Sequence, residues 1–311
     1  MQRRRALVVG ANGQDGTFLV RHLLERGHDT TGIGLEGRSL HVRDDRYQYR
    51  TCDLRDRNAF ARLLEELRPQ DVFHFAAVHA SAARNRYEPV FADMLDVNVK
   101  SLHAVLEYAR GSAEPVRLTY AASAKCFGET LPAEIDEGTP RRSDCLYGIT
   151  KNAAVDLVRY YRTAHAVPSG VVYLFNHESE LRPPEFFIPK VAQALRRARD
   201  GVAEPVALHS LDFHCDWGSA DEFMAMVVDA LALAPGEDFV LGSGRCVFAR
   251  DMVRDVFAAE GFDAEEHLEA PRREPQNAPY QVKIDRIAER LGRRPERRIE
   301  EVVRQMSEVG G

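Results

Sequence analysis

The chain has 311 residues, of which 44% are hydrophobic, and it carries a formal net charge of -6 at pH 7. Such a chain is long enough to bury a full core, and its acidic balance disfavours nucleic acid as a partner. No apolar run reaches membrane-spanning length, and the stretch after Arg3, Arg4 and Arg5 is too short for a signal peptide, so we expect a cytoplasmic protein without a membrane partner.

The first half of the chain alternates short apolar strands with amphipathic helices. In chain order, the apolar spacing predicts strands at 6–9, 29–35, 47–52, 71–77, 116–122 and 169–174, and helices at 17–26, 58–67, 93–110, 147–165 and 188–199. Such alternation is typical of an α/β fold with a doubly wound parallel sheet, the Rossmann arrangement.

The pattern loosens after Asn176 into a proline-rich stretch and shorter elements. We therefore expect a dinucleotide-binding domain over 1–175. A smaller, partly helical, substrate-binding lobe is expected over 176–311, some segments of which can return to the first domain.

The turn between the first strand and the first helix contains Gly10, Gly13 and Gly16. Without side chains, the first two let the backbone approach a pyrophosphate, whose charge suits a helix N-terminus, and the third lets the helix pack closely on the sheet. Because the glycines follow a strand and precede a helix, they predict a nicotinamide dinucleotide site. The turn also contributes Asn12, Gln14 and Asp15 to that site.

Two later segments are expected to hold the adenosine end of the cofactor. Glu36 lies at the distance from the glycine turn at which an acidic residue binds the ribose diol, which favours NAD. Arg38 could instead hold a 2'-phosphate, which would favour NADP. Asp53 and Leu54 end the third strand, where the carboxylate can meet the adenine amino group or can cap the next segment.

The predicted chemistry belongs to Ser123, Tyr147 and Lys151. Residues four apart on a helix share one face, so the ammonium of Lys151 is expected to stabilise the phenolate of Tyr147 and make it a usable base. Ser123 follows a sheet strand and can orient the same substrate oxygen.

The five cysteines are Cys52, Cys126, Cys145, Cys215 and Cys246, with no CxxC pair and no His-rich spacing. This scatter predicts a reducing compartment and no metal site.

Together these segments resemble the extended short-chain dehydrogenase/reductases, and among them the GDP-mannose 4,6-dehydratase family. The matching stretches are GANGQDG at 10–16, YGITK at 147–151, LFNHES at 174–179 and DWG at 216–218. The resemblance implies a Rossmann domain with a nucleotide-sugar lobe, a tightly bound and recycled nicotinamide cofactor, and a homodimer or homotetramer. It further places Ala76, Ala77, His177 and Arg182 at the cofactor, and His79, Asn176, Glu178 and Lys190 at the substrate.

The chain departs from that family at two positions. Where the dehydratases carry Thr-x-Glu, it has Ser123, Ala124 and Lys125, so the glutamate that serves as acid and base is missing. The resemblance to CDP-glucose 4,6-dehydratases, which have Ser-Asp-Lys here, implies proton transfer by Lys125. Cys215 stands where relatives have an arginine suited to a diphosphate. Either Arg245 or Arg273 replaces that charge, or the substrate lacks a diphosphate.

These residues lead to three hypotheses. The first is a dehydratase that oxidises a sugar nucleotide or related nucleoside transiently, loses water, and returns the hydride. In it, a desolvated Lys125 removes the proton next to the ketone, the alternative being that Lys125 is a solvated loop lysine. His177 and Glu178 could also serve, or could simply orient their loop. The second is an epimerase or reductase of the same fold, and the third is a catalytically silent binding protein.

Overall fold

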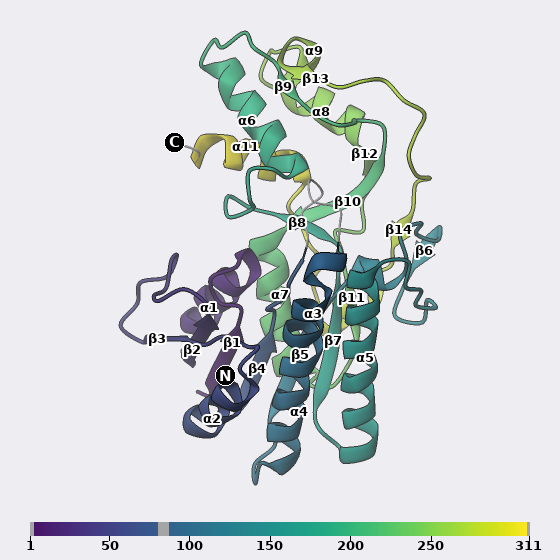
Figure 1. The fold of residues 1–311 in the computed structure, drawn as a ribbon. Coiled ribbons are helices and arrows are strands. Elements are labelled where there is room, and N and C mark those ends of the chain that lie inside the picture. The colour runs from purple at the N-terminus through teal and green to yellow at the C-terminus, as the bar shows by residue number, and fades with distance from the viewer. Residues whose placement is uncertain (1–2, 80–86, 310–311) are drawn as a thin grey trace.

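A parallel seven-stranded sheet forms the larger part of the molecule (Figure 1). The computed structural model describes residues 3–79 and 87–309. The sheet has the order β11-β7-β5-β4-β1-β2-β3, and every neighbouring pair is parallel. Its strands are β1 (Arg5–Val9), β2 (Asp29–Gly34), β3 (Tyr47–Thr51), β4 (Asp71–His74), β5 (Arg117–Ser123), β7 (Ser169–Leu174) and β11 (Phe239–Leu241). The predicted α/β fold is thus confirmed.

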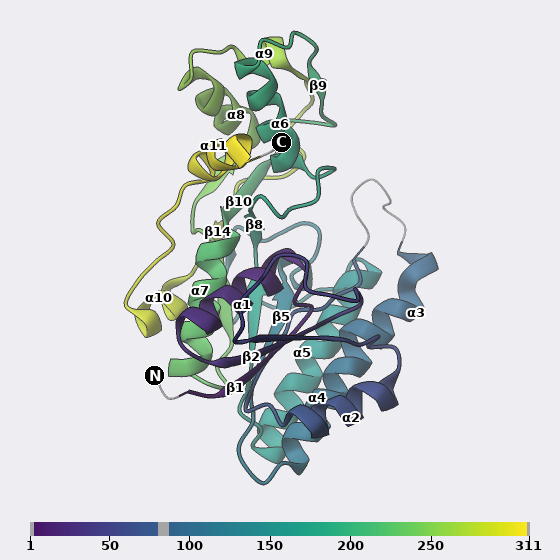
Figure 2. The ribbon, with the colours of Figure 1, turned by 90° about the vertical axis from the view of Figure 1, so that its left-hand side faces the viewer.

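Helices cover both faces of this sheet (Figure 2). One face carries α1 (Gln14–Glu25), α7 (Ala220–Leu233) and α10 (Asp285–Leu291), and the other carries α2 (Arg57–Leu67), α4 (Ser101–Gly111) and α5 (Leu146–His165). Strands buried on both faces read as continuous apolar runs, and Leu7, Val8 and Val9 of β1 are fully buried. On α1 the apolar stripe faces the core as the sequence predicts, with Phe18, Leu19, Leu23 and Leu24 buried.

The single helix expected over 93–110 is three segments. These are α3 (Phe91–Met94), the π-helical turn η3 (Leu95–Lys100) and α4. A short 3-10 turn, η2 (Glu88–Val90), precedes them. Elsewhere the predicted ends differ from the observed ones by a few residues, and β4 already ends at His74.

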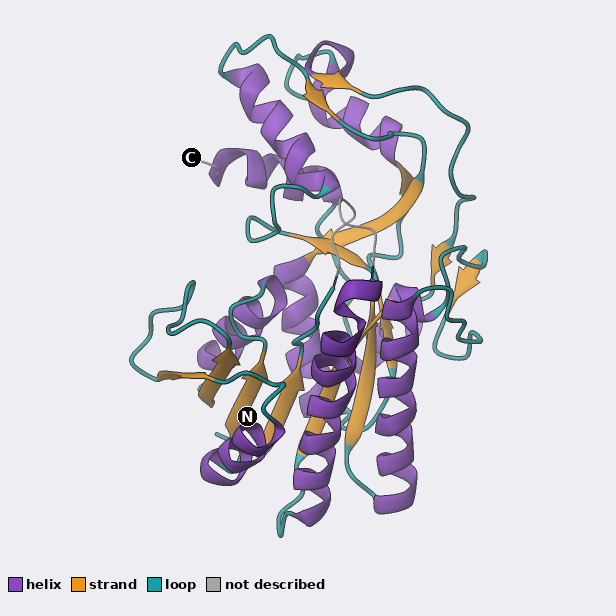
Figure 3. Ribbon diagram, viewed as in Figure 1, coloured by secondary structure: helices purple, strands orange, loops and turns teal. Residues whose placement is uncertain are grey.

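The smaller lobe has a hydrophobic core of its own, centred on Ile188, Leu195, Trp217, Val253 and Val303. Its helices are α6 (Phe187–Arg199), α8 (Ala249–Ala258), α9 (Ala264–His267) and α11 (Ile299–Val309). Its sheets pair β8 (Asn176–Glu178) and β12 (Cys246–Phe248) with β10 (His214–Ser219), and β9 (Val206–Ala207) with β13 (Leu268–Glu269). A further small sheet pairs β6 (Glu134–Ile135) with β14 (Gln281–Val282), and Figure 3 shows all the strands in orange.

The chain passes between the two parts more than once. After β8 and α6 it returns to the large sheet through α7, which packs on α1, and through β11, which forms an edge. Segments beyond residue 175 therefore complete the large sheet and its helical cover. Within 3–79 and 87–309, no helix is long and apolar enough to cross a membrane. The same residues contain no group of three or more His, Cys, Asp or Glu side chains that could hold a metal ion.

Candidate active site

The glycine turn after β1 has no room for a side chain at Gly10 or Gly16, whereas a Cβ on Gly13 would meet only an ordinary contact at 3.4 Å. Gly10 has φ +94°, and a Cβ there would lie 2.7 Å from the main-chain nitrogen of Ala76. A Cβ on Gly16 would lie 2.1 Å from the Gly10 carbonyl oxygen. The turn therefore brings bare backbone to the N-terminus of α1, which is the form a pyrophosphate site requires.

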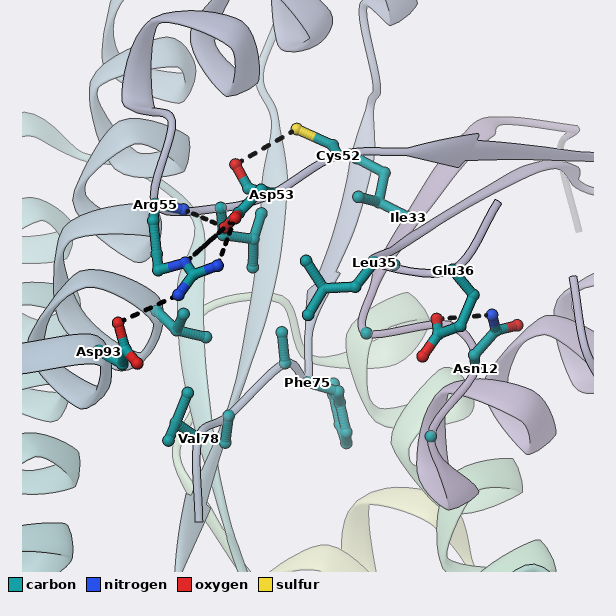
Figure 4. Close-up of a pocket in the computed structure, with 17 residues that line it drawn as sticks. Asn12, Ile33, Leu35, Glu36, Cys52, Asp53, Arg55, Phe75, Val78 and Asp93 are labelled. Atoms are coloured by element: carbon teal, nitrogen blue, oxygen red, sulfur yellow. Dashed lines mark hydrogen bonds and ion pairs between the residues drawn. The ribbon is translucent and has the colours of Figure 1, made fainter. Parts of the chain in front are cut away.

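A cavity of about 480 Å³ opens beside this turn (Figure 4). Eight of the predicted cofactor residues line it, namely Gly10, Asn12, Gly13, Glu36, Asp53, Leu54, Ala76 and Ala77. The structure also adds Arg55, Asp93 and Val97, which sequence reasoning missed because they reach the cavity from outside the glycine and acidic motifs. The residues present fit an adenosine moiety in size and polarity.

Glu36 is fixed at one end of this cavity. Its carboxylate accepts hydrogen bonds from Asn12 Nδ2 at 2.9 Å and from the Tyr49 hydroxyl at 3.3 Å. The hydrogen bond from Asn12 is the largest cause that holds the pKa of Glu36 below its usual range. Among the described residues, the cavity lining does not include Arg38, whose carbonyl accepts from Asn12 Nδ2 at 3.0 Å.

Asp53 both lines the cavity and shapes the following turn. Its Oδ1 accepts the Arg55 main-chain N–H at 3.0 Å. The N-cap of α2 is instead Asp56, which accepts from the Ala59 N–H at 2.9 Å. Asp53 therefore caps the turn that follows it, as one of its two expected roles requires, although it is not the N-cap of α2. It also lines the cavity in which the adenine contact is expected.

Tyr147 and Lys151 lie one turn apart on α5 and are both buried. The Lys151 ammonium donates to the Ala121 carbonyl at 2.7 Å and lies 5.6 Å from the centre of the Tyr147 ring. Burial lowers the pKa of Lys151 to about 8. Burial also raises the pKa of Tyr147 above its ordinary value, whereas the sequence predicts that Lys151 lowers it. Loss of hydration is the largest cause of that rise, and the charge that opposes it is the guanidinium of Arg182.

Ser123 ends β5, and the 3-10 turn η4 (Ala124–Cys126) follows it. The Lys125 main-chain N–H donates to Ser123 Oγ at 3.3 Å. A Cβ on Gly148 of α5 would lie 2.8 Å from the Lys125 carbonyl, so this glycine allows η4 to lie against the helix of Tyr147. Ser123, Lys125 and Tyr147 thus come from segments in direct contact.

The Lys125 side chain does not have the burial expected for a base. It is 42% exposed, and its ammonium lies 3.7 Å from the Glu129 carboxylate. The expected desolvation of Lys125 is therefore not present in this structure.

Aromatic rings flank Tyr147. His79 packs edge-on against it, with ring centres 4.8 Å apart, and Tyr87 stacks on it at 6.2 Å with an interplanar angle of 16°. His79 therefore lies where a substrate contact is expected. Tyr87 was missed because no motif marks it.

The start of α1, directly after the glycine turn, is joined to β8 by side chains. His177 Nε2 lies 2.9 Å from the Asp15 carboxylate, and Gln14 Nε2 donates to the His177 carbonyl at 3.1 Å. The Ser179 hydroxyl donates to Gln14 Oε1 at 2.9 Å. Gln14, Asp15 and His177, all predicted at the cofactor, are therefore brought together.

Buried Glu178 and half-buried Arg182 form a pair beyond that junction. The Glu178 carboxylate lies 3.5 Å from Arg182 Nε, and the guanidinium lies 4.1 Å from the centre of the Phe186 ring. Burial raises the pKa of Glu178 to about 7. Within the described residues, neither Glu178 Oε2 nor Arg182 Nε has a hydrogen-bond partner.

Only some of the substrate residues expected in the lobe lie together in the structure. Asn176 Nδ2 donates to Cys215 Sγ at 2.8 Å, which unites two of them. The Arg245 guanidinium donates instead to the carbonyls of Pro295, Glu296 and Arg297. Arg245 therefore secures the chain before α11, while half-buried Lys190 lies on α6 and Arg273 is exposed.

Asn98 on η3 is a buried residue that sequence reasoning missed. Its side chain accepts the Val78 N–H at 2.8 Å and donates to Thr150 Oγ1 at 3.1 Å. It thereby connects the segment after β4 with α5, next to Lys151. A polar residue on the buried side of an apolar helical run was the available signal.

Comparison with known proteins gives consistent relatives. A family model described as GDP-mannose 4,6 dehydratase matches residues 7–306. The chain is 26% identical over 285 residues to GDP-mannose 4,6 dehydratase 1 of Arabidopsis thaliana, which covers 87% of this chain and 79% of the relative. Among solved structures, dTDP-glucose 4,6-dehydratase of Bacillus anthracis in complex with NAD superposes with a TM-score of 0.79, at 16% identity, over 98% of this chain and 96% of that chain. UDP-glucuronic acid 4-epimerase of Bacillus cereus in complex with NAD also superposes with a TM-score of 0.79, at 17% identity, over 98% and 97% of the two chains.

Proposed function

Because the chain belongs to the GDP-mannose 4,6 dehydratase family, we propose that it is an NAD(P)-dependent dehydratase of a sugar nucleotide or of a nucleoside without the diphosphate. The observation that carries this proposal is the buried Tyr147–Lys151 pair on α5. The same Rossmann sheet carries, after β1, a glycine turn of the form that binds a dinucleotide. The names of the relatives, which include both dehydratases and an epimerase, support the reaction class.

The proposed roles follow from the positions of the side chains. A bound nicotinamide supplies the hydride acceptor and later the hydride donor. Tyr147 exchanges a proton with the sugar hydroxyl as that carbon becomes a ketone, and Ser123 orients the same oxygen. Lys151 anchors on the Ala121 carbonyl and keeps its ammonium beside the phenol ring.

Elimination needs a second proton carrier, and we assign it to Lys125. Its amine takes the proton from the carbon next to the ketone, and the ammonium so formed returns that proton to the hydroxyl on the following carbon, which leaves as water. A neutral amine is required, and burial favours it. Since Lys125 is 42% exposed, the bound sugar itself must displace water from it.

The cofactor proposed is NAD. Glu36 is hydrogen-bonded in the adenosine cavity with a lowered pKa, so at neutral pH it presents a negative charge where NADP carries its 2'-phosphate. Arg38 is not among the described residues that line the cavity.

An epimerase or a 4-keto reductase is the alternative, and the exposure of Lys125 is the observation that favours it. Neither reaction needs a proton carrier at that position. A silent binding protein is disfavoured because it has no use for a buried lysine beside a tyrosine.

Mass spectrometry separates these functions. The purified protein is incubated, without added reductant, with GDP-, CDP- and UDP-sugars and with nucleosides that lack the diphosphate. Loss of the mass of one water supports the dehydratase, an unchanged mass with altered retention supports the epimerase, and turnover only with added NAD(P)H supports the reductase. If every substrate remains unchanged under both conditions, the enzymatic proposals fail.

Variants test the assigned roles. Tyr147→Phe should lose all turnover, and Lys125→Ala should lose elimination while retaining bound cofactor. Lys283→Ala, a lysine paired with Glu134 on the small sheet of β6 and β14, is the matched control. Water loss by Lys125→Ala at the wild-type rate would remove Lys125 from the mechanism.

A further inference from the structure

Three charged side chains meet at one end of the adenosine cavity. Arg55, between β3 and α2, donates from Nη2 to Asp53 Oδ2 at 2.7 Å and from Nη1 to Asp93 Oδ1 at 3.3 Å. All three residues line the cavity, and Asp93 reaches it from α3. Figure 4 shows them across the cavity from Glu36 and Asn12. We call this group the Asp53–Arg55–Asp93 bridge.

The bridge does little for folding. Its side chains are 50%, 40% and 45% exposed for Arg55, Asp53 and Asp93, respectively. Exposed ion pairs of this kind contribute about 0–1 kcal/mol to stability. Because two segments of the chain converge to form the bridge at the rim of a cavity, we expect the bridge to act in ligand binding.

The chemistry of the bridge suits a purine ring. A guanidinium whose N–H groups are held along its edge by two carboxylates leaves its planar face free, and that face stacks on aromatic rings. Both carboxylate oxygens of Asp53 accept from Arg55, which holds the pKa of Asp53 below the usual range. Because the side chain is still 40% exposed and lines the cavity, the carboxylate can also accept from an exocyclic amino group. Adenine provides both the ring face and the amino group.

We propose that Arg55 is the residue that contacts the adenine ring of the cofactor, and that Asp93 holds it in place from α3. A ring that covers Arg55 excludes water, and both ion pairs strengthen as the local dielectric constant falls. Asp53 then selects adenine over hypoxanthine, which has no amino group at that position. The inference rests on the proposed function only through its dinucleotide, so it can be tested without any sugar.

Isothermal titration of the dialysed full-length protein tests the proposal, with NAD, ADP-ribose, nicotinamide mononucleotide and nicotinamide hypoxanthine dinucleotide as ligands. Arg55→Met should weaken the binding of NAD and of ADP-ribose by about tenfold in Kd, because loss of a desolvated cation–π contact has roughly that effect. Nicotinamide mononucleotide should be unaffected. Arg55→Lys keeps the positive charge but lacks the planar guanidinium, so it should show an intermediate loss of NAD affinity. Asp93→Asn should show a smaller loss of NAD affinity.

Two further comparisons sharpen the result. Asp53→Asn should reduce the preference for NAD over nicotinamide hypoxanthine dinucleotide. The control is Arg57→Met, which changes an exposed arginine that does not line the described cavity. This variant should bind NAD and ADP-ribose with wild-type affinity. Wild-type affinity for ADP-ribose in both Arg55→Met and Asp93→Asn overturns the inference, as does equal weakening of the mononucleotide. If the wild-type protein itself binds neither NAD nor ADP-ribose, the proposed function fails instead.

Discussion

His177 Nε2 and the Asp15 carboxylate lie 2.9 Å apart although 162 residues separate them in the chain. The contact joins the first turn of α1 to β8 and so fixes the cofactor turn against the start of the smaller lobe. Burial alone would lower the pKa of His177, but the charge and hydrogen bond of Asp15 outweigh it, and the pKa is raised. Burial of Asp15 is likewise outweighed by His177, and the pKa of the carboxyl is lowered.

Asp15→Asn should therefore reduce the free energy of unfolding by about 2 kcal/mol, since the ion pair is largely desolvated. The raised pKa of His177 adds stability that is full below about pH 6.5 and is lost as pH rises through the folded value. The lowered pKa of Asp15 adds stability that is present above about pH 4 and is lost in more acidic solution. Urea unfolding should thus show the largest difference from wild type between those values.

The matched control for this substitution is Glu65→Gln, which changes an exposed carboxylate on α2. Its unfolding midpoint should follow that of the wild-type protein at every pH. A difference between Asp15→Asn and wild type that did not vary with pH would contradict the charged pairing of Asp15 and His177.

Gly16→Ala should abolish dinucleotide binding and destabilise the fold. The added Cβ would lie 2.1 Å from the Gly10 carbonyl oxygen, a main-chain atom, so the turn must open. Overpacking of this kind costs about 1–3 kcal/mol. Gly111→Ala, at the end of α4, meets nothing within 4 Å and is the control. Wild-type NAD affinity in a folded Gly16→Ala protein would show that the turn tolerates a side chain.

Gly148→Ala should lower kcat by roughly tenfold to a hundredfold, because small misplacements of catalytic groups have large effects. The new Cβ would lie 2.8 Å from the Lys125 carbonyl and would displace η4, and with it Ser123, from Tyr147. NAD affinity, measured by titration, should remain unchanged. An unaltered kcat on a substrate found by mass spectrometry would mean that this contact does not position the site.

Glu178→Gln should alter the pH dependence of stability. Burial raises the pKa of Glu178 to about 7, so its contribution is full below the unfolded pKa near 4.3 and is lost as pH rises to about 7. The variant lacks this titration, so its unfolding free energy should rise relative to wild type by at most about 1.4 kcal/mol per pH unit in that interval. Glu185→Gln, on an exposed neighbour, should give a curve parallel to that of wild type. Parallel curves for Glu178→Gln as well would show that the carboxylate is already ionised.

Local patterns predicted much of the fold. The alternation of apolar strands and amphipathic helices indicated the parallel sheet, and β7 and the end of α5 lie where the spacing placed them. The exception was the helix expected over 93–110, in which the turn at Asn98 is π-helical. Apolar periodicity does not distinguish the two helical forms, because both bury one face. The glycine turn could also be predicted, because the spacing of its glycines indicates where two main-chain segments approach each other closely.

The predicted site was less complete for a physical reason. Arg55 and Asp93 meet only because the loop after β3 and α3 converge on one cavity. Burial raises the pKa of Tyr147, and Lys125 remains exposed. Both properties depend on packing by residues from many segments of the chain. Neither quantity is encoded in the spacing of four residues on a helix.

The sequence by itself therefore determined the strand and helix periodicity, the bare glycine turn, and the placement of Tyr147 and Lys151 on one face of α5, because each depends on residues close in the chain. Only the tertiary structure decided that His177 pairs with Asp15 and that Arg245 secures the chain before α11. It also returned β11 to the large sheet. These relationships depend on packing between distant segments, and packing sets which groups are desolvated and which charges meet.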